Sequence, residues 1–195
     1  MPDILNLLIK KFEEDYRSYS YVMKANHDDD SHIDLILRYY YMAPGFVRME
    51  MIKPFRGAVI AYDPERGTAH VRPFGGVKSF VLELEPGSRL IRGPQDHRVD
   101  ESDILTLLRT VKDLARKGEV VVNKRKGIIV ITVRGKGGHV VRKRIGSFVL
   151  QFKERGFIPI YAASYDEEGE FIEEVFFEDF KSPLPLGKDF FDLKR

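Results

Sequence analysis

Apolar and polar residues alternate along many short stretches of this chain, which is the pattern of β-strands with one buried face. The clearest stretch is 33–41, where every second residue is Ile, Leu or Tyr. Turn-forming sequences such as Pro44-Gly45 separate the stretches, and each connection is short enough to join antiparallel neighbours. The pattern predicts about eleven strands, at 18–23, 33–41, 47–51, 58–62, 68–72, 80–84, 119–125, 128–134, 140–152, 157–165 and 171–180.

Two segments have the different spacing of a helix with one apolar face. Apolar residues recur at three- and four-residue intervals between Ile4 and Phe12, and the same spacing returns between Ile104 and Ala115. Asp103 is suited to cap the second helix, and Gly118 follows its end. Helices are therefore expected at about 2–16 and at 104–115. The predicted fold class is α+β, a single antiparallel half-barrel with two covering helices.

The length and composition favour one folded domain. A chain of 195 residues is enough for one core of substantial size, so residues 1–195 are predicted to form a single domain. Hydrophobic residues make up 43% of the sequence, which argues against intrinsic disorder. The sequence contains no cysteine, and this excludes disulfides, thiolate zinc sites and cysteine nucleophiles.

Uncharged stretches such as 39–47 and 156–165 are about half as long as the roughly 20 residues that a membrane-spanning helix needs. No such helix is expected. The start, Met1-Pro2-Asp3-Ile4, lacks a basic region followed by an apolar core, so no signal peptide is expected in this chain.

Two polar segments contain potential metal ligands. The run His27–His32 offers imidazoles and carboxylates, but a solvated hairpin tip is the favoured interpretation because no ligands at metal spacing complete a site elsewhere. Asp96, His97 and Asp100 form a similar group, for which a plain polar loop is the favoured interpretation. No metal or cofactor is expected.

Catalytic motifs are also missing from the sequence. Gly135, Gly137 and Gly138 follow a strand as a phosphate loop would, but no helix and no Gly-Lys-Ser/Thr ending follow them, so a hairpin tip is favoured. No nucleophile elbow or paired-histidine zinc helix is present. The chain is predicted not to be an enzyme.

Basic residues gather between Arg116 and Arg144, a segment that contains ten Lys and Arg and a single acid, Glu119. This segment could attract nucleic acid or anionic lipid. It contains no interleaved aromatic residue on which bases could stack, so no nucleic-acid binding is expected. The competing interpretation is a solvated sheet face that partly faces the eight acids between Asp166 and Asp179.

The apolar face of the predicted sheet is larger than two helices can cover tightly, so a cavity is a natural outcome. Met23, Met42, Met49 and Met51 cluster in the first hairpins, and flexible thioethers suit an apolar guest of variable shape. Ordinary core packing is the competing interpretation and is favoured by periodicity alone.

Several segments resemble the periplasmic lipoprotein-carrier (LolA-like) superfamily. They are the order of helix and long hairpin, Tyr40–Glu50, the strand end at Lys53-Pro54, Gly57–Asp63, Phe157–Ile160, Tyr165–Gly169 and Phe177–Lys181. The resemblance covers most of the chain through loose patterns. It implies an eleven-stranded half-barrel, lidded by helices, that holds acyl chains in the periplasm or cell envelope after removal of a leader. Ala43 stands where the best-known carriers have an arginine that helps to hold and release the lipoprotein.

The function expected from this resemblance is non-catalytic binding or transport of a lipid or lipidated protein. The alternative is an envelope sensor or scaffold that binds a protein partner, with its apolar face filled by its own helices. A third hypothesis is an enzyme whose site the sequence does not reveal. The expected ligand is a lipid or acyl chain, and an anionic membrane surface or an envelope protein are further candidate partners.

The predicted cavity residues lie on the more apolar side of their strands or on the inward faces of the helices. They are Met23, Leu35, Leu37, Tyr39, Val47, Met49, Met51, Leu107, Leu108, Val111, Ile129, Ile131, Ile160 and Phe176.

Overall fold

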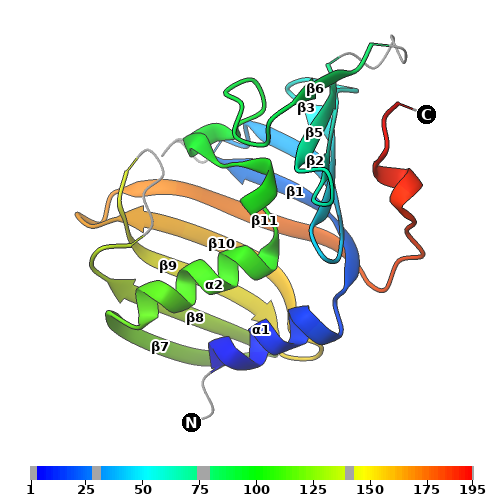
Figure 1. Cartoon of the computed structure of the whole chain (residues 1–195). Coiled ribbons are helices and arrows are strands. Elements are labelled where there is room, and N and C mark those ends of the chain that lie inside the picture. Colours follow the sequence, from blue (N-terminus) through cyan, green and yellow to red (C-terminus); the bar gives the residue numbers. More distant parts are fainter. Residues whose placement is uncertain (1–3, 28–31, 74–79, 139–142, 195) are drawn as a thin grey trace.

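The computed structural model describes residues 4–27, 32–73, 80–138 and 143–194 (Figure 1). The helices of this part are α1 (Ile4–Glu14), α2 (Ile104–Ala115) and the short 3-10 helices η1 (Pro94–Asp96), η2 (Val99–Glu101) and η3 (Lys188–Phe191). The strands are β1 (Ser18–Asn26), β2 (Leu35–Met42), β3 (Phe46–Lys53), β4 (Val59–Asp63), β5 (Thr68–Arg72), β6 (Leu82–Leu84), β7 (Gly118–Arg125), β8 (Ile128–Gly135), β9 (Ile145–Lys153), β10 (Ile158–Asp166) and β11 (Phe171–Lys181).

Across the described ranges, the eleven strands form one antiparallel sheet in the order β6-β5-β4-β3-β2-β1-β11-β10-β9-β8-β7. Chain neighbours pair within each half, and the pairing of β1 with β11 joins the two halves. The sheet stays open, with β6 and β7 at its edges, and it curves around α1 and α2 (Figure 1). This confirms the predicted half-barrel. The expected strand at 140–152 begins outside the described residues, and its described part is β9.

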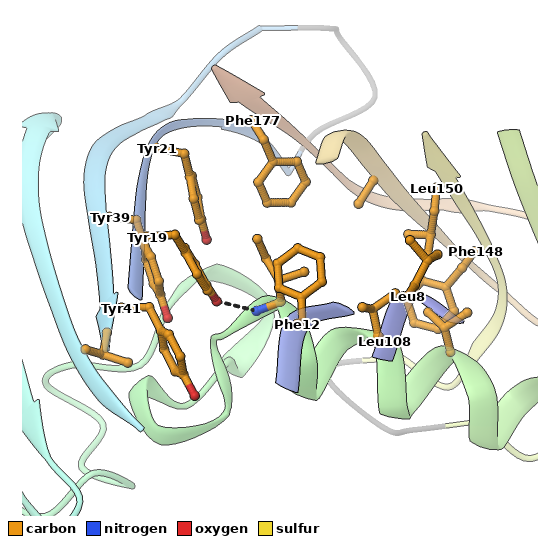
Figure 2. Packing of buried hydrophobic residues seen from close by; sticks show 14 of the residues in the cluster. Leu8, Phe12, Tyr19, Tyr21, Tyr39, Tyr41, Leu108, Phe148, Leu150 and Phe177 are labelled. Carbon is orange, nitrogen blue, oxygen red and sulfur yellow. Dashed lines mark hydrogen bonds between the residues drawn. The ribbon is translucent and has the colours of Figure 1, made fainter. Parts of the chain in front are cut away.

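A row of tyrosines lies on the inner face, the face toward the helices. The register of β1 and β2 places Tyr19 opposite Tyr41 and Tyr21 opposite Tyr39. The ring centroids of these pairs are 4.8 Å and 4.9 Å apart, and the rings are nearly parallel. Figure 2 shows the four rings side by side, with Phe12 and Phe177 next to them. Such aromatic cross-strand pairs stabilise the centre of the sheet.

Both long helices bury their apolar faces against the inner face. Leu8 and Phe12 of α1 and Leu108 and Val111 of α2 are buried, as their spacing predicts. The side chain of Asp103 caps α2 by accepting a 3.0 Å hydrogen bond from the backbone N–H of Thr106.

The chain after β11 crosses the outer face of the sheet. We call residues 182–194 the C-terminal strap; it lies outside β2–β5 in Figure 1. Phe191 packs on Phe46 with ring centroids 5.5 Å apart, and Leu193 packs on Val59 and Ala61. The guanidinium of Arg48 donates a 2.7 Å hydrogen bond to the backbone carbonyl of Phe190.

Candidate ligand-binding site

The inner face of the sheet is packed at one end and hollow elsewhere. Ile129, Ile131 and Val133 of β8 are buried with the helices and with Leu150 of β9 in one core cluster. A cavity of about 700 Å³ lies between β1–β4, β9–β11 and the segment that leads into α2. Its volume is within the range of pockets that enclose small-molecule ligands.

Half of the predicted cavity residues line this cavity. They come from β1, β2, β3 and α2, and they are Met23, Leu35, Leu37, Tyr39, Met49, Met51 and Leu107. The three methionines and two leucines of the strands give the walls their apolar character. Ligand binding by these residues remains a prediction.

Five other predicted residues are buried but do not line the cavity. Val47, Leu108, Val111, Ile129 and Ile131 are at most 1% exposed and belong to the packed core. They lie on the predicted inner side. Helix α2 packs against β8, where Ile129 and Ile131 lie, so no space remains beside these two residues.

Ile160 and Phe176 were placed wrongly by the sequence pattern. Phe176 contacts Tyr161 with a centroid distance of 5.2 Å, while Val175 and Phe177 line the cavity. Because β11 carries Val175, Phe176 and Phe177 in succession, alternation alone does not identify the inner side. The pairing of β10 with β9 shifts register between Pro159 and Tyr161, and the partly buried Ile160 falls within this irregularity.

The roof of the cavity includes a segment that the sequence analysis treated as a polar loop. We call residues 90–103 the lid segment. Its Ile91 and Val99 are buried in the core cluster. Ser102 contacts the sheet through a 3.1 Å hydrogen bond with the hydroxyl of Tyr39, and Gln95 donates a 3.2 Å hydrogen bond to the carbonyl of Ile172. The isolated apolar residues Ile91 and Val99 were the available sequence signal for this role.

Polar side chains gather at one end of the cavity. His27 Nδ1 is 2.8 Å from Asp34 Oδ1, and its Nε2 is 3.7 Å from Glu173 Oε2. Glu173 Oε1 is also 2.8 Å from His97 Nε2, so a lid residue contacts β11. Ser164 of β10 is paired with Glu173 across the strands. Among these residues, the sequence pattern points to the two histidines, whereas Glu173 is one of the eight acids between Asp166 and Asp179 and Ser164 belongs to no motif.

The protonation states of the lining residues have clear physical causes. Burial alone would lower the pKa of His97, but the hydrogen bond and negative charge of Glu173 outweigh it and raise this pKa above 6.5. Burial raises the pKa of Tyr21 and Tyr39 well above 10, so both phenols are neutral at physiological pH. The tyrosines therefore offer hydroxyl groups and no charge.

The run His27–His32, for which a metal loop was weighed against a hairpin tip, largely falls on residues 28–31, which lie outside the described residues. Within the described ranges, no three or more His, Asp or Glu side chains are grouped so that they could hold a metal ion. A second hollow, of about 640 Å³, lies between the outer sides of α1 and α2. Its walls are mostly charged, as Lys10, Glu13 and Arg116 illustrate, and do not suit an apolar ligand.

The basic segment partly faces the acidic final hairpin, as one interpretation of the sequence expected. Lys143 Nζ is 3.0 Å from Asp166 Oδ2, and the backbone N–H of Gly137 donates to Glu167. Lys124 contacts Glu154 at 2.7 Å. Arg142 and His139 lie outside the described residues. No helix in the described part of the chain is long and apolar enough to span a membrane.

The fold and the cavity define a class of open antiparallel half-barrels with a helical lid. No protein-family model matches the sequence, and no curated protein is similar to it. Solved structures with a similar fold include an uncharacterised conserved protein from Thermus thermophilus, with a TM-score of 0.57 at 10% identity, over 97% of this chain and 93% of that one.

MucB of Pseudomonas aeruginosa, solved in complex with MucA, is similar at a TM-score of 0.50 and 13% identity. The match covers 95% of this chain and 58% of that one. A LolA superfamily protein from Nitrosomonas europaea aligns over 96% of this chain and 97% of that one, with a TM-score of 0.39 and 13% identity.

Proposed function

We propose that the protein binds the apolar part of a lipid or lipidated protein in its cavity, without catalysis, in the bacterial cell envelope. The observation that carries the proposal is the cavity of about 700 Å³ with methionine, leucine and aromatic walls. Each methylene moved from water into such a site contributes roughly 0.8 kcal/mol, so part of an acyl chain is enough for useful affinity. The envelope location is supported by the sequence resemblance to LolA-like carriers.

The mode of retention follows from the side chain at position 43. Ala43, which replaces the arginine of the best-known carriers, is partly buried against the core cluster. A methyl group donates no hydrogen bonds, so this position cannot act as a polar latch. Chain retention then depends on apolar burial in the cavity.

Native mass spectrometry of protein purified without detergent tests the proposal. We expect one apolar adduct of defined mass, which is lost in a Met49→Glu variant, because a carboxylate in the apolar wall is costly beside a buried chain. An Arg48→Ala variant on the outer face is the control and should keep the adduct. Protein that carries no adduct and also takes up no apolar dye would contradict the proposal.

Binding of a protein partner is the second candidate function, and the sheet edge favours it. Val120, Val121 and Val122 of the edge strand β7 are 39%, 41% and 37% exposed. An exposed edge offers unpaired backbone groups to an added strand. The complex of the similarly folded MucB with MucA is consistent with this function. If the cavity binds no apolar dye, protein-partner binding is favoured over lipid binding as the function.

An anionic membrane surface is a further candidate contact for the turn between β7 and β8. Lys124, Arg125 and Lys126 are exposed there. Each well-placed basic residue near an anionic bilayer contributes at most about 1 kcal/mol. Binding to vesicles should increase with anionic lipid content and fall with salt concentration. Vesicle binding that depends on neither would exclude this contact.

A further inference from the structure

One hydroxyl group in the cavity wall has no partner in the described part of the chain. Ser164 lines the cavity and is only 2% exposed, and its Oγ makes no hydrogen bond to another described group. A buried hydroxyl without a partner costs free energy. The position is therefore prepared for a polar group that a ligand brings with it.

The residue directly opposite Ser164 provides a carboxylate acceptor. The register of β10 and β11 pairs Ser164 with Glu173, which places both side chains on the inner face. One carboxylate oxygen of Glu173 contacts His97 at 2.8 Å, whereas the other is 3.7 Å from the nearer nitrogen of His27, beyond hydrogen-bond distance. This second oxygen can accept a hydrogen bond from a ligand.

The charges that line the cavity disfavour an anion. Four carboxylates line the cavity, namely Asp34, Glu101, Asp103 and Glu173. The two arginines among the lining residues are already paired, Arg92 with Asp96 at 2.6 Å and Arg98 with Asp100 at 2.7 Å. The histidines His27 and His97 contact Asp34 and Glu173. An anionic head group would meet these carboxylates without an unpaired arginine to bind.

We infer that the cavity selects an amphiphile whose head group is uncharged and carries hydroxyl groups next to the chain, as a glycerol ester does. One hydroxyl of the ligand donates to Glu173, and a hydrogen bond with Ser164 satisfies the buried serine. The chain extends along the inner face past Met23 and Leu37 toward Met49. This inference rests on the proposed function and adds the chemical class of the head group to it.

The test compares two ligands with the same twelve-carbon chain, 1-monolauroylglycerol and laurate, at a pH where laurate is ionised. Each displaces the apolar dye N-phenyl-1-naphthylamine from the full-length protein. We expect the glycerol ester to bind more than about tenfold more tightly than laurate. Equal affinities, or tighter binding of laurate, would overturn the inference.

Single substitutions test whether Ser164 and Glu173 cause the preference for the glycerol ester. Ser164→Ala should weaken monolauroylglycerol binding about fivefold relative to the dye affinity of the same variant. Glu173→Gln should reduce the preference for monolauroylglycerol over laurate by a similar factor. The controls are Ser147→Ala and Glu174→Gln, whose strand positions face outward next to Phe148 and Glu173.

The outcomes distinguish a failure of the proposed function from a failure of the head-group inference. If the wild-type protein does not bind the dye or either ligand, the proposed function fails. If it binds the dye but Ser164→Ala behaves like Ser147→Ala, the proposed function stands and the head-group inference is wrong. Circular dichroism and melting of each variant confirm that the comparison is between folded proteins.

Discussion

The hydroxyl of Tyr19 accepts a 3.3 Å hydrogen bond from the backbone N–H of Ile104, the first residue of α2 (Figure 2). The first N–H groups of a helix have no partner within the helix, so a buried helix start needs one from outside. Tyr19 is 1% exposed, and burial raises the pKa of its phenol well above 10, which keeps it neutral. A residue at the centre of the sheet thus fixes the start of α2.

Removing this hydroxyl should destabilise the protein measurably. Tyr19→Phe leaves the buried N–H of Ile104 without a partner, and we expect the free energy of unfolding to fall by about 1–3 kcal/mol. Urea denaturation measures the change. Tyr41→Phe is the control, because it trims the stacked partner of Tyr19 without removing this bond. Equal effects of the two substitutions would contradict the role of the bond.

A charge on the buried face of α2 should destabilise the protein far more than the same charge on the exposed face of α1. Leu108 is fully buried, so Leu108→Asp should cost more than about 3 kcal/mol or prevent folding. Leu7 of α1 is 43% exposed, so Leu7→Asp should change stability little. Thermal melting compares them, and similar melting temperatures would show that α2 is not held as described.

Dye binding should distinguish the two faces of β3. Met49 lines the cavity, whereas Arg48 contacts Glu50 and Phe190 on the outer face. Met49→Glu should weaken binding of an apolar dye by more than about tenfold, because a carboxylate in an apolar wall carries a large desolvation cost. Arg48→Ala should leave dye affinity unchanged. A large loss with Arg48→Ala alone would mean that the strand faces are reversed.

The C-terminal strap should support stability and leave binding unaffected. Phe191 is 2% exposed and packs against Phe46 on the face opposite the cavity. Phe191→Ala should lower the free energy of unfolding by about 3–5 kcal/mol, the usual cost of removing a buried aromatic ring. Dye affinity of the folded fraction, titrated in parallel, should stay the same. A changed affinity would show that the strap acts on the cavity.

The contact of His97 with Glu173 predicts a pH dependence of stability. Because the folded-state pKa of His97 is raised above 6.5, its contribution is fully present below about pH 6.5 and is lost as pH rises through the raised value. The melting temperatures of the wild type and of His97→Gln, measured from about pH 5 to about pH 9, should therefore converge toward high pH. A difference that stays constant or grows with pH would refute this assignment.

The sequence predicts this architecture well because its periods are clear. Strands such as β2 have apolar residues at every second position, and α2 begins and ends at the predicted residues. The faces were harder to assign where the period breaks, as at Val175-Phe176-Phe177 or at the register shift beside Ile160. Alternation gives one inner side only when no extra residue enters the ladder.

The candidate site is less predictable because it depends on tertiary neighbours. Whether an inward residue such as Ile131 or Met51 touches solid core or empty space is decided by where the helices lie, which local sequence does not determine. The pair of Ser164 and Glu173 arises from the register of two strands. The pattern of either strand alone treats both residues as ordinary polar positions.

The packed and hollow parts of the inner face lie on one sheet and share side chains such as Tyr39 and Phe148, but some residues belong to the packed part alone. A change at Met51 alters the space for a guest, whereas Leu108 and Ile131 remain in the packed core. Substitutions at partly buried lining residues such as Met49 and Met51 can therefore reshape the cavity without a matching adjustment of Leu108 or Ile131. During evolution, such a scaffold can change the shape of its hollow part while the packed part keeps the fold stable.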